Sequence, residues 1–210
     1  MSREPSAEAI REALRRRTPR QLHEPGLTPA AVLIPLFQKD GAWHLLFTRR
    51  SMQLPVHPGQ ISFPGGAQDP EDADLLAAAL RESEEEMGIA PKDVTVLGQL
   101  DDIATITGFR VTAFAGVIPY PYPFRPSEEE IAEVIEIPLA GFLDPSVFRR
   151  DTSWRRGKEP YLVYGFQCGA HNVWGATAKI MKQFLEIALG WQEPEIEAAP
   201  AHTSPGDRRR

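Results

Sequence analysis

The chain has 210 residues, of which 42% are hydrophobic and 25% are charged, and its formal net charge at pH 7 is −6. This is the composition of an ordinary globular protein, and the length is sufficient for one large domain with a substantial core. A negative net charge argues against nucleic acid as the partner. Because no apolar run reaches the roughly 18 residues of a membrane-spanning helix, the sequence predicts no membrane contact.

The N-terminus and the single cysteine bear on the compartment. Charged residues are scattered through the first 17 positions without an apolar stretch, which argues against a secretory signal. Cys168 is the only cysteine, so no intramolecular disulfide can form, as is usual in a reducing cytosol. We therefore expect a cytoplasmic protein. Because its neighbours form a strand-like stretch, we interpret Cys168 as a buried structural thiol, with a nucleophilic role as the alternative.

The first expected element is a basic surface helix over residues 6–17, followed by a linker over residues 18–28. Further along the chain, short apolar or alternating runs bounded by turn residues predict strands. These strands are expected at residues 30–38, 43–49, 61–63, 93–101, 109–118, 131–139 and 162–167. The polar, proline-rich sequence of residues 191–210 is typical of a disordered tail.

A helix with a strongly acidic end is expected over residues 72–87, since Gly88 suits a C-terminal cap and Pro91 prevents continuation. Its N-terminal cap is one of three aspartates, Asp69, Asp72 or Asp74. One buried stripe is expected on this helix, formed by Leu76, Ala79, Leu80, Ser83 and Met87. With a last helix over residues 175–190, the mixture of strands and helices predicts an α/β or α+β sandwich.

Three glutamates lie on one face of this acidic helix. Glu82, Glu85 and Glu86 stand at positions i, i+3 and i+4, so their carboxylates can converge beside the buried stripe. A set of oxygen ligands suits a hard divalent cation such as Mg²⁺ or Mn²⁺, and no Cys or His stands at a spacing that suits zinc. The alternative interpretation is a solvated acidic helix end, which is the more usual reason for a run of glutamates.

The stretch from Gly66 to Ile89 resembles the Nudix box, G-x5-E-x7-R-E-U-x-E-E-x-G-U, in which U is a bulky apolar residue. The second half of the box is matched by Arg81-Glu82, Glu85-Glu86 and Gly88-Ile89. Two departures accompany this match: Ser83 occupies a position of U, and the segment before Arg81 is one residue longer than in the general box. The first glutamate of the box therefore has two imperfect counterparts, Glu71 and Asp72, and neither is assigned to a metal.

The longer spacing is shared by the coenzyme A pyrophosphatase branch of the Nudix family, whose upstream signature is similar to two motifs of this chain. These motifs are LLFTRRS at residues 45–51 and FPGG at residues 63–66, with Gly59 between them. The sequence VWGATAKI at residues 173–180 also resembles this branch. Pro55 departs from it, because the branch usually has an arginine there. The resemblance covers residues 30–190.

The resemblance implies a Nudix-type α/β/α sandwich with a mixed sheet over residues 29–190, preceded by the N-terminal helix and linker of residues 1–28. It implies metal-dependent hydrolysis of the diphosphate bond of coenzyme A or its derivatives. The products would be 3′,5′-ADP and 4′-phosphopantetheine, or the acyl form of the latter. The partner is thus a small nucleotide substrate, with Mg²⁺ or Mn²⁺ as the cofactor.

The resemblance also implies roles for single residues. Glu82, Glu85 and Glu86 would be catalytic and hold the metal, and Arg81 would orient a carboxylate through charge-assisted hydrogen bonds. Gly65 and Gly66 would bring the backbone close to the substrate. Of the two strand residues Arg49 and Arg50, alternation predicts that one faces the site. We expect Arg50 to contact the 3′-phosphate that distinguishes coenzyme A from dephospho-coenzyme A.

The sequence leaves several alternatives open. The substrate could be another nucleoside diphosphate derivative, such as ADP-ribose or NADH, or the chain could be a non-catalytic nucleotide-binding module. The general base is not identified, and the candidates are Asp101, Asp102 and Glu128–Glu130. The preferred form of coenzyme A, the number of metal ions and the oligomeric state, including a homodimer, also stay open.

Overall fold

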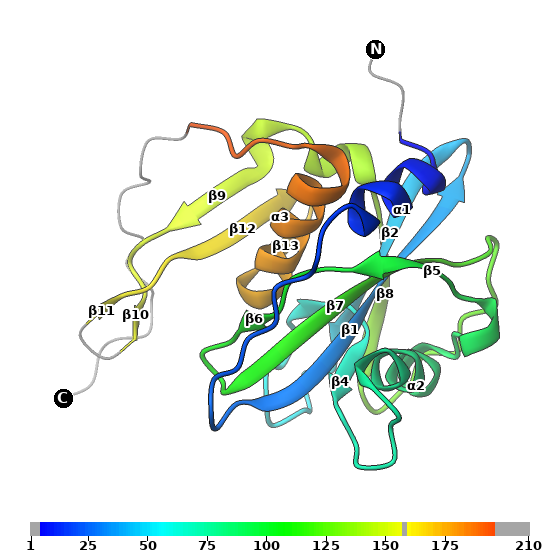
Figure 1. Cartoon of the computed structure of the whole chain (residues 1–210), viewed down its shortest axis with the longest axis horizontal. Helices are drawn as coiled ribbons and strands as arrows, with labels where there is room; N and C mark the ends of the chain where they lie inside the picture. Colours follow the sequence, from blue (N-terminus) through cyan, green and yellow to red (C-terminus); the bar gives the residue numbers. More distant parts are fainter. Residues whose placement is uncertain (1–4, 157–158, 196–210) are drawn as a thin grey trace.

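The computed structural model describes residues 5–156 and 159–195, and Figure 1 shows its helices packed around a large sheet. The helices are α1 (Ala7–Arg15), α2 (Leu75–Met87) and α3 (Gly175–Leu189), with 3-10 turns at Pro91–Asp93, Leu139–Phe142 and Pro145–Val147. None of the described helices is long and apolar enough to span a membrane.

The main sheet has eight strands, and its central order is β3-β2-β1-β7-β5, with β4 beside β1, β6 beside β7 and β8 beside β2. Strands β1 and β7 run parallel, whereas the other pairs of this sheet are antiparallel, so the sheet is mixed as predicted. Its strands are β1 (Thr28–Lys39), β2 (Ala42–Arg50), β3 (Ile61–Ser62), β4 (Gly65–Ala67), β5 (Thr95–Gln99), β6 (Ile103–Ala104), β7 (Phe109–Val117) and β8 (Ile131–Pro138).

Alternation along β1 explains the layers. Ile34 and Leu36 point into a core cluster that also contains residues of α1 and α3, whereas Ala31 packs against Ala78 and Ala79 of α2. Both faces of the strand are therefore buried, which accounts for its continuous apolar run. Helices α1 and α3 cover one face of the sheet and α2 covers the other (Figure 1). The predicted α/β/α sandwich is confirmed.

A smaller sheet was only partly predicted. Strand β12 (Val163–Cys168) lies between β9 (Phe148–Asp151) and β13 (His171–Trp174), and a separate hairpin joins β10 (Arg155–Arg156) to β11 (Glu159–Pro160). The sequence predicted β12, but it missed β9 and β13, which have only four residues each and include charged or polar side chains. Phe148 of β9 and Val173 of β13 are fully buried.

The N-terminal helix differs from the expectation of a surface helix. Its N-cap is Ser6, whose side chain accepts a hydrogen bond from the Ala9 N–H. Ile10 and Leu14 are buried in the main core cluster, 0% and 2% exposed, because α1 packs against α3 and β5. The helix is thus amphipathic, with an apolar inner face and an outer face that carries both acidic and basic side chains. The domain boundary near residue 28 remains a prediction, although it does not separate two cores.

The tail was also expected to be disordered from residue 191, and its first residues contradict this. Trp191 packs against Phe148 and Phe166, with ring centroids 5.3 and 6.2 Å apart. The carboxylate of Glu193 pairs with Arg150 and, at 3.1 Å, with Lys182. The chain after α3 therefore folds back on the small sheet. Residues 196–210, the rest of the predicted tail, lie outside the described residues.

Candidate active site

The two glycines of the FPGG motif form β4, which pairs with β1 at the edge of α2. Gly65 lies opposite Val32 and Gly66 opposite Ala31. Gly65 has φ +149°, and a Cβ there would come within 2.3 Å of the Ala31 carbonyl oxygen. A Cβ at Gly66 would lie 2.5 Å from the carboxylate carbon of Glu82. The motif thus permits the close approach of β4 both to β1 and to the acidic helix.

Helix α2 begins later than predicted, at Leu75, because Asp74 is its cap and accepts a hydrogen bond of 2.8 Å from the Ala77 N–H. Its end is as expected: Gly88 has φ +70° and donates its N–H to the Glu84 carbonyl. The unusual Ser83 is fully buried and donates its hydroxyl to the Ala79 carbonyl at 2.6 Å. This bond satisfies the hydroxyl at a position where an apolar residue was expected.

The buried face of α2 is rotated from the predicted stripe. Ala79, Ser83 and Met87 are buried as expected, but Leu76 and Leu80 are only half-buried. Ala78 and Glu86 take their places, and Glu86 is 4% exposed. A carboxylate thus enters the interior at the point where the helix meets Gly65.

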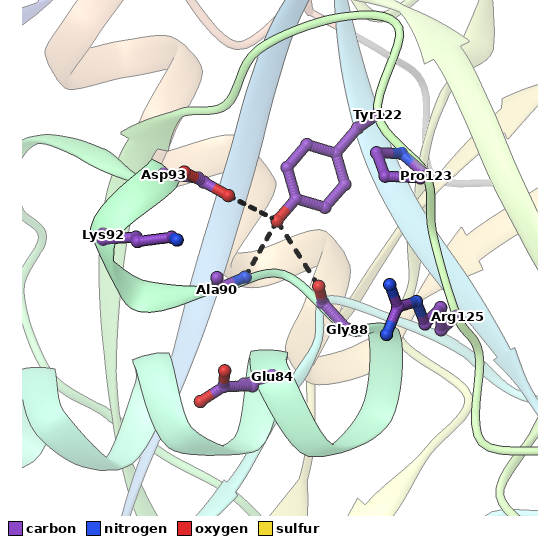
Figure 2. A pocket seen from close by; sticks show the side chains of 8 residues that line it. All are labelled: Glu84, Gly88, Ala90, Lys92, Asp93, Tyr122, Pro123 and Arg125. Atoms are coloured by element: carbon purple, nitrogen blue, oxygen red, sulfur yellow. Dashed lines mark hydrogen bonds between the residues drawn. The ribbon is translucent and has the colours of Figure 1, made fainter.

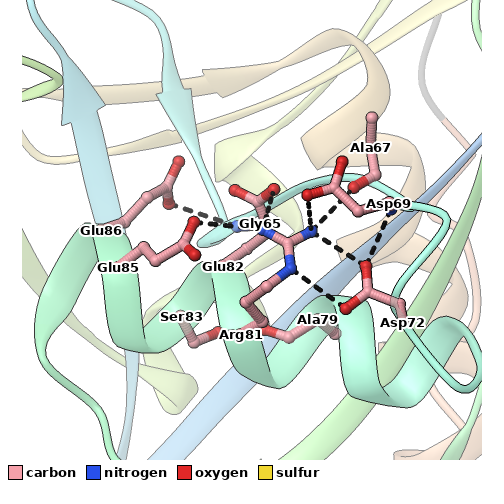
Figure 3. A network of polar contacts seen from close by, with 10 residues as sticks. All are labelled: Gly65, Ala67, Asp69, Asp72, Ala79, Arg81, Glu82, Ser83, Glu85 and Glu86. Atoms are coloured by element: carbon pink, nitrogen blue, oxygen red, sulfur yellow. Dashed lines mark hydrogen bonds and ion pairs between the residues drawn. The ribbon is translucent and has the colours of Figure 1, made fainter.

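Arg81 connects the acidic groups of this site (Figure 3). Its Nε and Nη2 donate to the two carboxylate oxygens of Asp72, both at 3.0 Å, in a two-pronged pair. Its Nη1 donates to Glu82 at 3.0 Å and to Glu85 at 3.1 Å, and Nη2 also reaches the Ala67 carbonyl at 3.1 Å. These contacts are the ones that the predicted orienting role of Arg81 needs, and that role stays a prediction.

Asp72, which the sequence left without a role, anchors that guanidinium. The hydrogen bonds from Arg81 lower the pKa of Asp72, and the bonds to Asp72 in turn raise the pKa of Arg81. Because both oxygens of Asp72 face Arg81, this carboxylate positions the arginine. The sequence contained one signal for this role, since the general count of the box leads from Gly66 to Asp72.

Glu86 has a strongly perturbed ionisation. Burial raises its pKa to about 8, and the charges of Glu82 and Glu130 act in the same direction. The Gly65 N–H, which donates to Glu86 Oε2 at 3.2 Å, and the charge of Arg50 oppose the rise. Burial also raises the pKa of Glu82, although Arg81 counteracts it. Glu86, which is buried, and Glu82, which is half-buried, thus form a pair of carboxylates with raised pKa values, an environment that a cation would stabilise.

The carboxylate oxygens are ligands of the kind that a hard cation prefers, and Arg81 donates hydrogen bonds to two of these carboxylates. Within the described part of the chain, no three His, Cys, Asp or Glu side chains already form a metal-binding group. Arg81 Nη1 bridges Glu82 and Glu85, and therefore supplies the positive charge between them. The donor set of Glu82, Glu85 and Glu86 consists of oxygens alone, as Mg²⁺ and Mn²⁺ prefer.

Arg49 and Arg50 diverge at the end of β2. The pairing of β2 with β8 shifts between these two residues, and such a bulge re-aims side chains. Arg49 binds Glu133 at 2.7 Å and the His171 ring at 3.3 Å. The charge of Arg50 instead acts on Glu86, and its buried Nε has no hydrogen-bond partner among the residues that the structure describes. Arg50 is therefore the one with a group left for a ligand.

The candidate bases Asp101 and Asp102 have other partners. Asp101 accepts the Arg20 N–H at 2.6 Å and pairs with the Arg17 guanidinium. Asp102 accepts the Leu22 N–H at 3.0 Å. Both carboxylates thus hold the segment that follows α1. Of the later candidates, Glu130 lies close enough to influence both Glu82 and Glu86.

Cys168 agrees with its structural interpretation. It is 9% exposed and belongs to the core cluster. Burial raises the pKa of its thiol to about 11, which makes the nucleophilic thiolate scarce at neutral pH.

A pocket of about 470 Å³ lies beside the C-terminal end of α2 (Figure 2). The Tyr122 hydroxyl closes one side, where it accepts the Ala90 N–H at 2.9 Å and donates to Asp93 at 2.9 Å. The residues around it are Glu84, Gly88, Ala90, Lys92, Asp93, Tyr122, Pro123 and Arg125. The pocket contains two basic and two acidic side chains, and Glu82, Glu85 and Glu86 are not part of it.

Comparisons with known proteins agree with this arrangement. A family model described as NUDIX domain matches residues 27–138. The uncharacterized Nudix hydrolase NudL of Escherichia coli (strain SMS-3-5 / SECEC) is 43% identical over 161 residues, which cover 77% of this chain and 82% of NudL. The protein of the same name from Shigella boydii serotype 18 gives the same identity and coverage.

Two solved structures give lower similarity. A MutT/nudix family protein from Enterococcus faecalis has a TM-score of 0.49 and 11% identity, covering 89% of this chain and 75% of that one. The Nudix hydrolase RenU from M. smegmatis has a TM-score of 0.47 and 24% identity, covering 56% of this chain and 74% of that one. The family model spans more than half of the chain, and NudL exceeds 40% identity over most of both proteins. The chain therefore belongs to the Nudix family, and it is a Nudix pyrophosphohydrolase.

Proposed function

We propose that this Nudix enzyme hydrolyses the diphosphate bond of coenzyme A or its derivatives, with Mg²⁺ or Mn²⁺ as the cofactor. The observation that carries the proposal is the convergence of two separate motifs on one carboxylate. The FPGG motif directs the Gly65 N–H to Glu86, and the LLFTRRS motif brings Arg50 close enough to influence the same residue. Both motifs resemble the coenzyme A branch, and on this proposal they would serve one site.

The residues of the site would have separate roles in the hydrolysis of a diphosphate. Glu82, Glu85 and Glu86 would hold the cation, which neutralises charge on the phosphate oxygens and activates water when bound. Arg81, fixed by Asp72, keeps the neighbouring carboxylates oriented. The burial of Glu86 lowers the local dielectric, so every charge near it acts more strongly than in water.

Arg50 would bind the substrate. Its buried Nε lacks a partner, and its position near Glu86 favours contact with the diphosphate over contact with a remote 3′-phosphate. Arg50→Ala should then lower kcat/KM for coenzyme A and dephospho-coenzyme A alike, by about 10- to 100-fold, the effect of one lost hydrogen bond to a charged group. Measuring both substrates on both proteins gives a four-value cycle. A loss confined to coenzyme A would return Arg50 to the 3′-phosphate.

The substrate assignment is tested by product analysis. The enzyme is incubated with coenzyme A and Mg²⁺ or Mn²⁺, and the products are identified by mass. We expect 3′,5′-ADP and 4′-phosphopantetheine, with parallel reactions on ADP-ribose and NADH much slower. Fast hydrolysis of ADP-ribose or NADH, with coenzyme A left intact, would replace the proposal by the alternative substrate class.

A further inference from the structure

Residues 51–60 form an uncharged loop that connects β2 to β3, directly after Arg50. The loop contains no aspartate, glutamate, lysine or arginine, although 25% of the chain is charged. Two of its apolar side chains are exposed, Met52 by 74% and Val56 by 55%, and Met52 is the most exposed large apolar side chain among those that the structure describes. Single exposed apolar residues are common in proteins, so the position of this loop decides what its exposed side chains can do.

Backbone hydrogen bonds give the loop a defined base. The Arg50 N–H donates to the Gln60 carbonyl at 2.9 Å, and the Gly59 N–H donates to the Arg50 carbonyl at 3.1 Å. Met52 folds back over this base, since a Cβ added to Gly59 would lie 2.7 Å from the Met52 sulfur. The exposed side chain of Met52 is therefore held at the base of the loop, beside the backbone of Arg50.

The loop is also tied to the backbone of α2. The Ser51 N–H donates to the Glu130 carbonyl at 2.7 Å, and the Ser127 N–H donates to the Glu86 carbonyl at 2.9 Å. Between these two bonds, the Glu130 N–H closes a turn on the Ser127 carbonyl at 3.1 Å. Because the Cα atoms at the two ends of such a turn lie less than about 7 Å apart, the distance from Met52 to Glu86 is within the length of a small substrate.

The distribution of charge at this site divides a ligand into two parts. The carboxylates with a bound cation and the Arg50 guanidinium suit a diphosphate, whereas the loop offers no charged group to a phosphate. A diphosphate that carries an uncharged, partly apolar arm matches this division. A nucleotide half, with a further phosphate and a polar base, does not match an uncharged apolar loop. Exposed apolar side chains next to a polar site are typical of a surface that contacts such an arm.

We propose that Met52 and Val56 form an apolar contact surface for the uncharged arm of a diphosphate ester. The inference rests on the proposed function in one respect, because coenzyme A makes that arm pantetheine, whose branched hydrocarbon portion directly follows the diphosphate. The two side chains determine specificity and take no part in the cleavage. Their contact with the arm favours coenzyme A over diphosphates such as ADP-ribose, in which the second half is a polar sugar.

The test measures the binding of the two halves of coenzyme A, neither of which contains the bond to be cleaved. In the presence of Mg²⁺, calorimetric titration compares 4′-phosphopantetheine with 3′,5′-ADP on the wild type, Met52→Gln, Val56→Thr and Met52→Leu. Met52→Gln and Val56→Thr nearly preserve the size of the side chain and add a polar group. Met52→Leu keeps the side chain apolar.

We expect Met52→Gln to weaken 4′-phosphopantetheine about 4- to 15-fold, the effect of one or two methylene groups that lose apolar burial. Val56→Thr should weaken it about 2- to 4-fold, because the hydroxyl replaces a single methyl group. In both variants the affinity for 3′,5′-ADP should change less than about twofold, since this half carries the charges and not the arm. Met52→Leu should bind both halves as the wild type does.

A matched control makes the same kind of change elsewhere. Leu143 is 40% exposed and follows the end of β8 at which Pro138 pairs with His44. The opposite end of β8 is the one that pairs with Arg50. Leu143→Gln should therefore leave both affinities unchanged. Melting temperatures establish that each variant is folded.

Three results would overturn this surface. They are equal losses for the two halves, an unaltered affinity for 4′-phosphopantetheine in both polar variants, and no binding of 4′-phosphopantetheine to the wild type. The product analysis of coenzyme A is a separate measurement. If coenzyme A is cleaved and these affinities do not change, the inference about the loop fails alone. If coenzyme A stays intact while Met52→Gln still weakens 4′-phosphopantetheine, the proposed function fails alone.

Discussion

Replacement of Glu86 by Gln separates the ionisation of this residue from its shape. Glutamine has nearly the size of glutamate and stays neutral, so Glu86→Gln preserves the packing of the 4% exposed side chain. It removes a charged ligand from the carboxylate set, and we expect kcat to fall about 100-fold or more, as for the loss of one transition-state electrostatic contact. Turnover near the wild-type rate at saturating metal would exclude Glu86 from the catalytic set.

The raised pKa of Glu86 predicts that the stability of the wild-type protein depends on pH. The pKa of Glu86 is about 8 in the folded protein, against about 4.3 in an unfolded chain. Since the folded state retains a proton that the unfolded chain has released, this stabilisation is complete below the unfolded pKa and is lost as the pH rises through 8. At about 1.4 kcal/mol for each pH unit between the two values, the loss is at most about 5 kcal/mol.

Urea denaturation in EDTA at pH 5, 7 and 9 measures this effect. The free energy of unfolding of the wild type should fall relative to that of Glu86→Gln as the pH rises, by roughly 2–5 kcal/mol over the range. Other titrating groups cancel in the difference between the two proteins. Parallel pH profiles would show that Glu86 ionises normally, and the reasoning from its burial would be refuted.

Three further outcomes follow from the contacts of the site and the tail. Gly66→Ala should lower kcat by about 10-fold or more with a modest fall in melting temperature, since the added Cβ meets only the end of the Glu82 side chain. In Gly65→Ala the added Cβ meets backbone, so urea titrations should show that the free energy of unfolding falls by several kcal/mol. Arg81→Lys should lower kcat about 10- to 100-fold and weaken Mn²⁺ binding in titrations, because lysine cannot form the fork to Asp72; unchanged Mn²⁺ affinity would argue against its orienting role. Truncation after Gly190 should cost about 1–3 kcal/mol of stability, because Trp191 leaves its ring contacts; an unchanged urea midpoint would show that the packing is dispensable.

Local signals in the sequence predicted the central elements of the fold. The apolar run of β1 and the glycine that ends α2 are properties of neighbouring residues, so the strand and the helix end were found within about two residues. The placement of three glutamates on one face of α2 likewise followed from the spacing of neighbouring residues. The start of α2 was misplaced because three aspartates were equally suitable as the N-cap. Only the hydrogen bond from the Ala77 N–H identifies Asp74 as the cap.

Long-range partners could not be predicted. Asp101 and Asp102 have the residue type of a catalytic base, but their hydrogen bonds reach residues about 80 positions away. The burial of Ile10 depends on α3, at the other end of the chain. The divergence of Arg49 and Arg50 depends on a bulge against β8, which strand alternation alone does not reveal.

The docking of α1 has a consequence for the unit that folds. The family match begins at residue 27, yet Ile10 and Leu14 complete the core that α3 and β5 share. A chain cut at residue 27 would leave an apolar surface open to solvent, including the place where the Leu14 side chain lies directly over Gly98. Such a surface favours self-association. In this protein, the segment that the family model matches is thus shorter than the segment that completes the hydrophobic core.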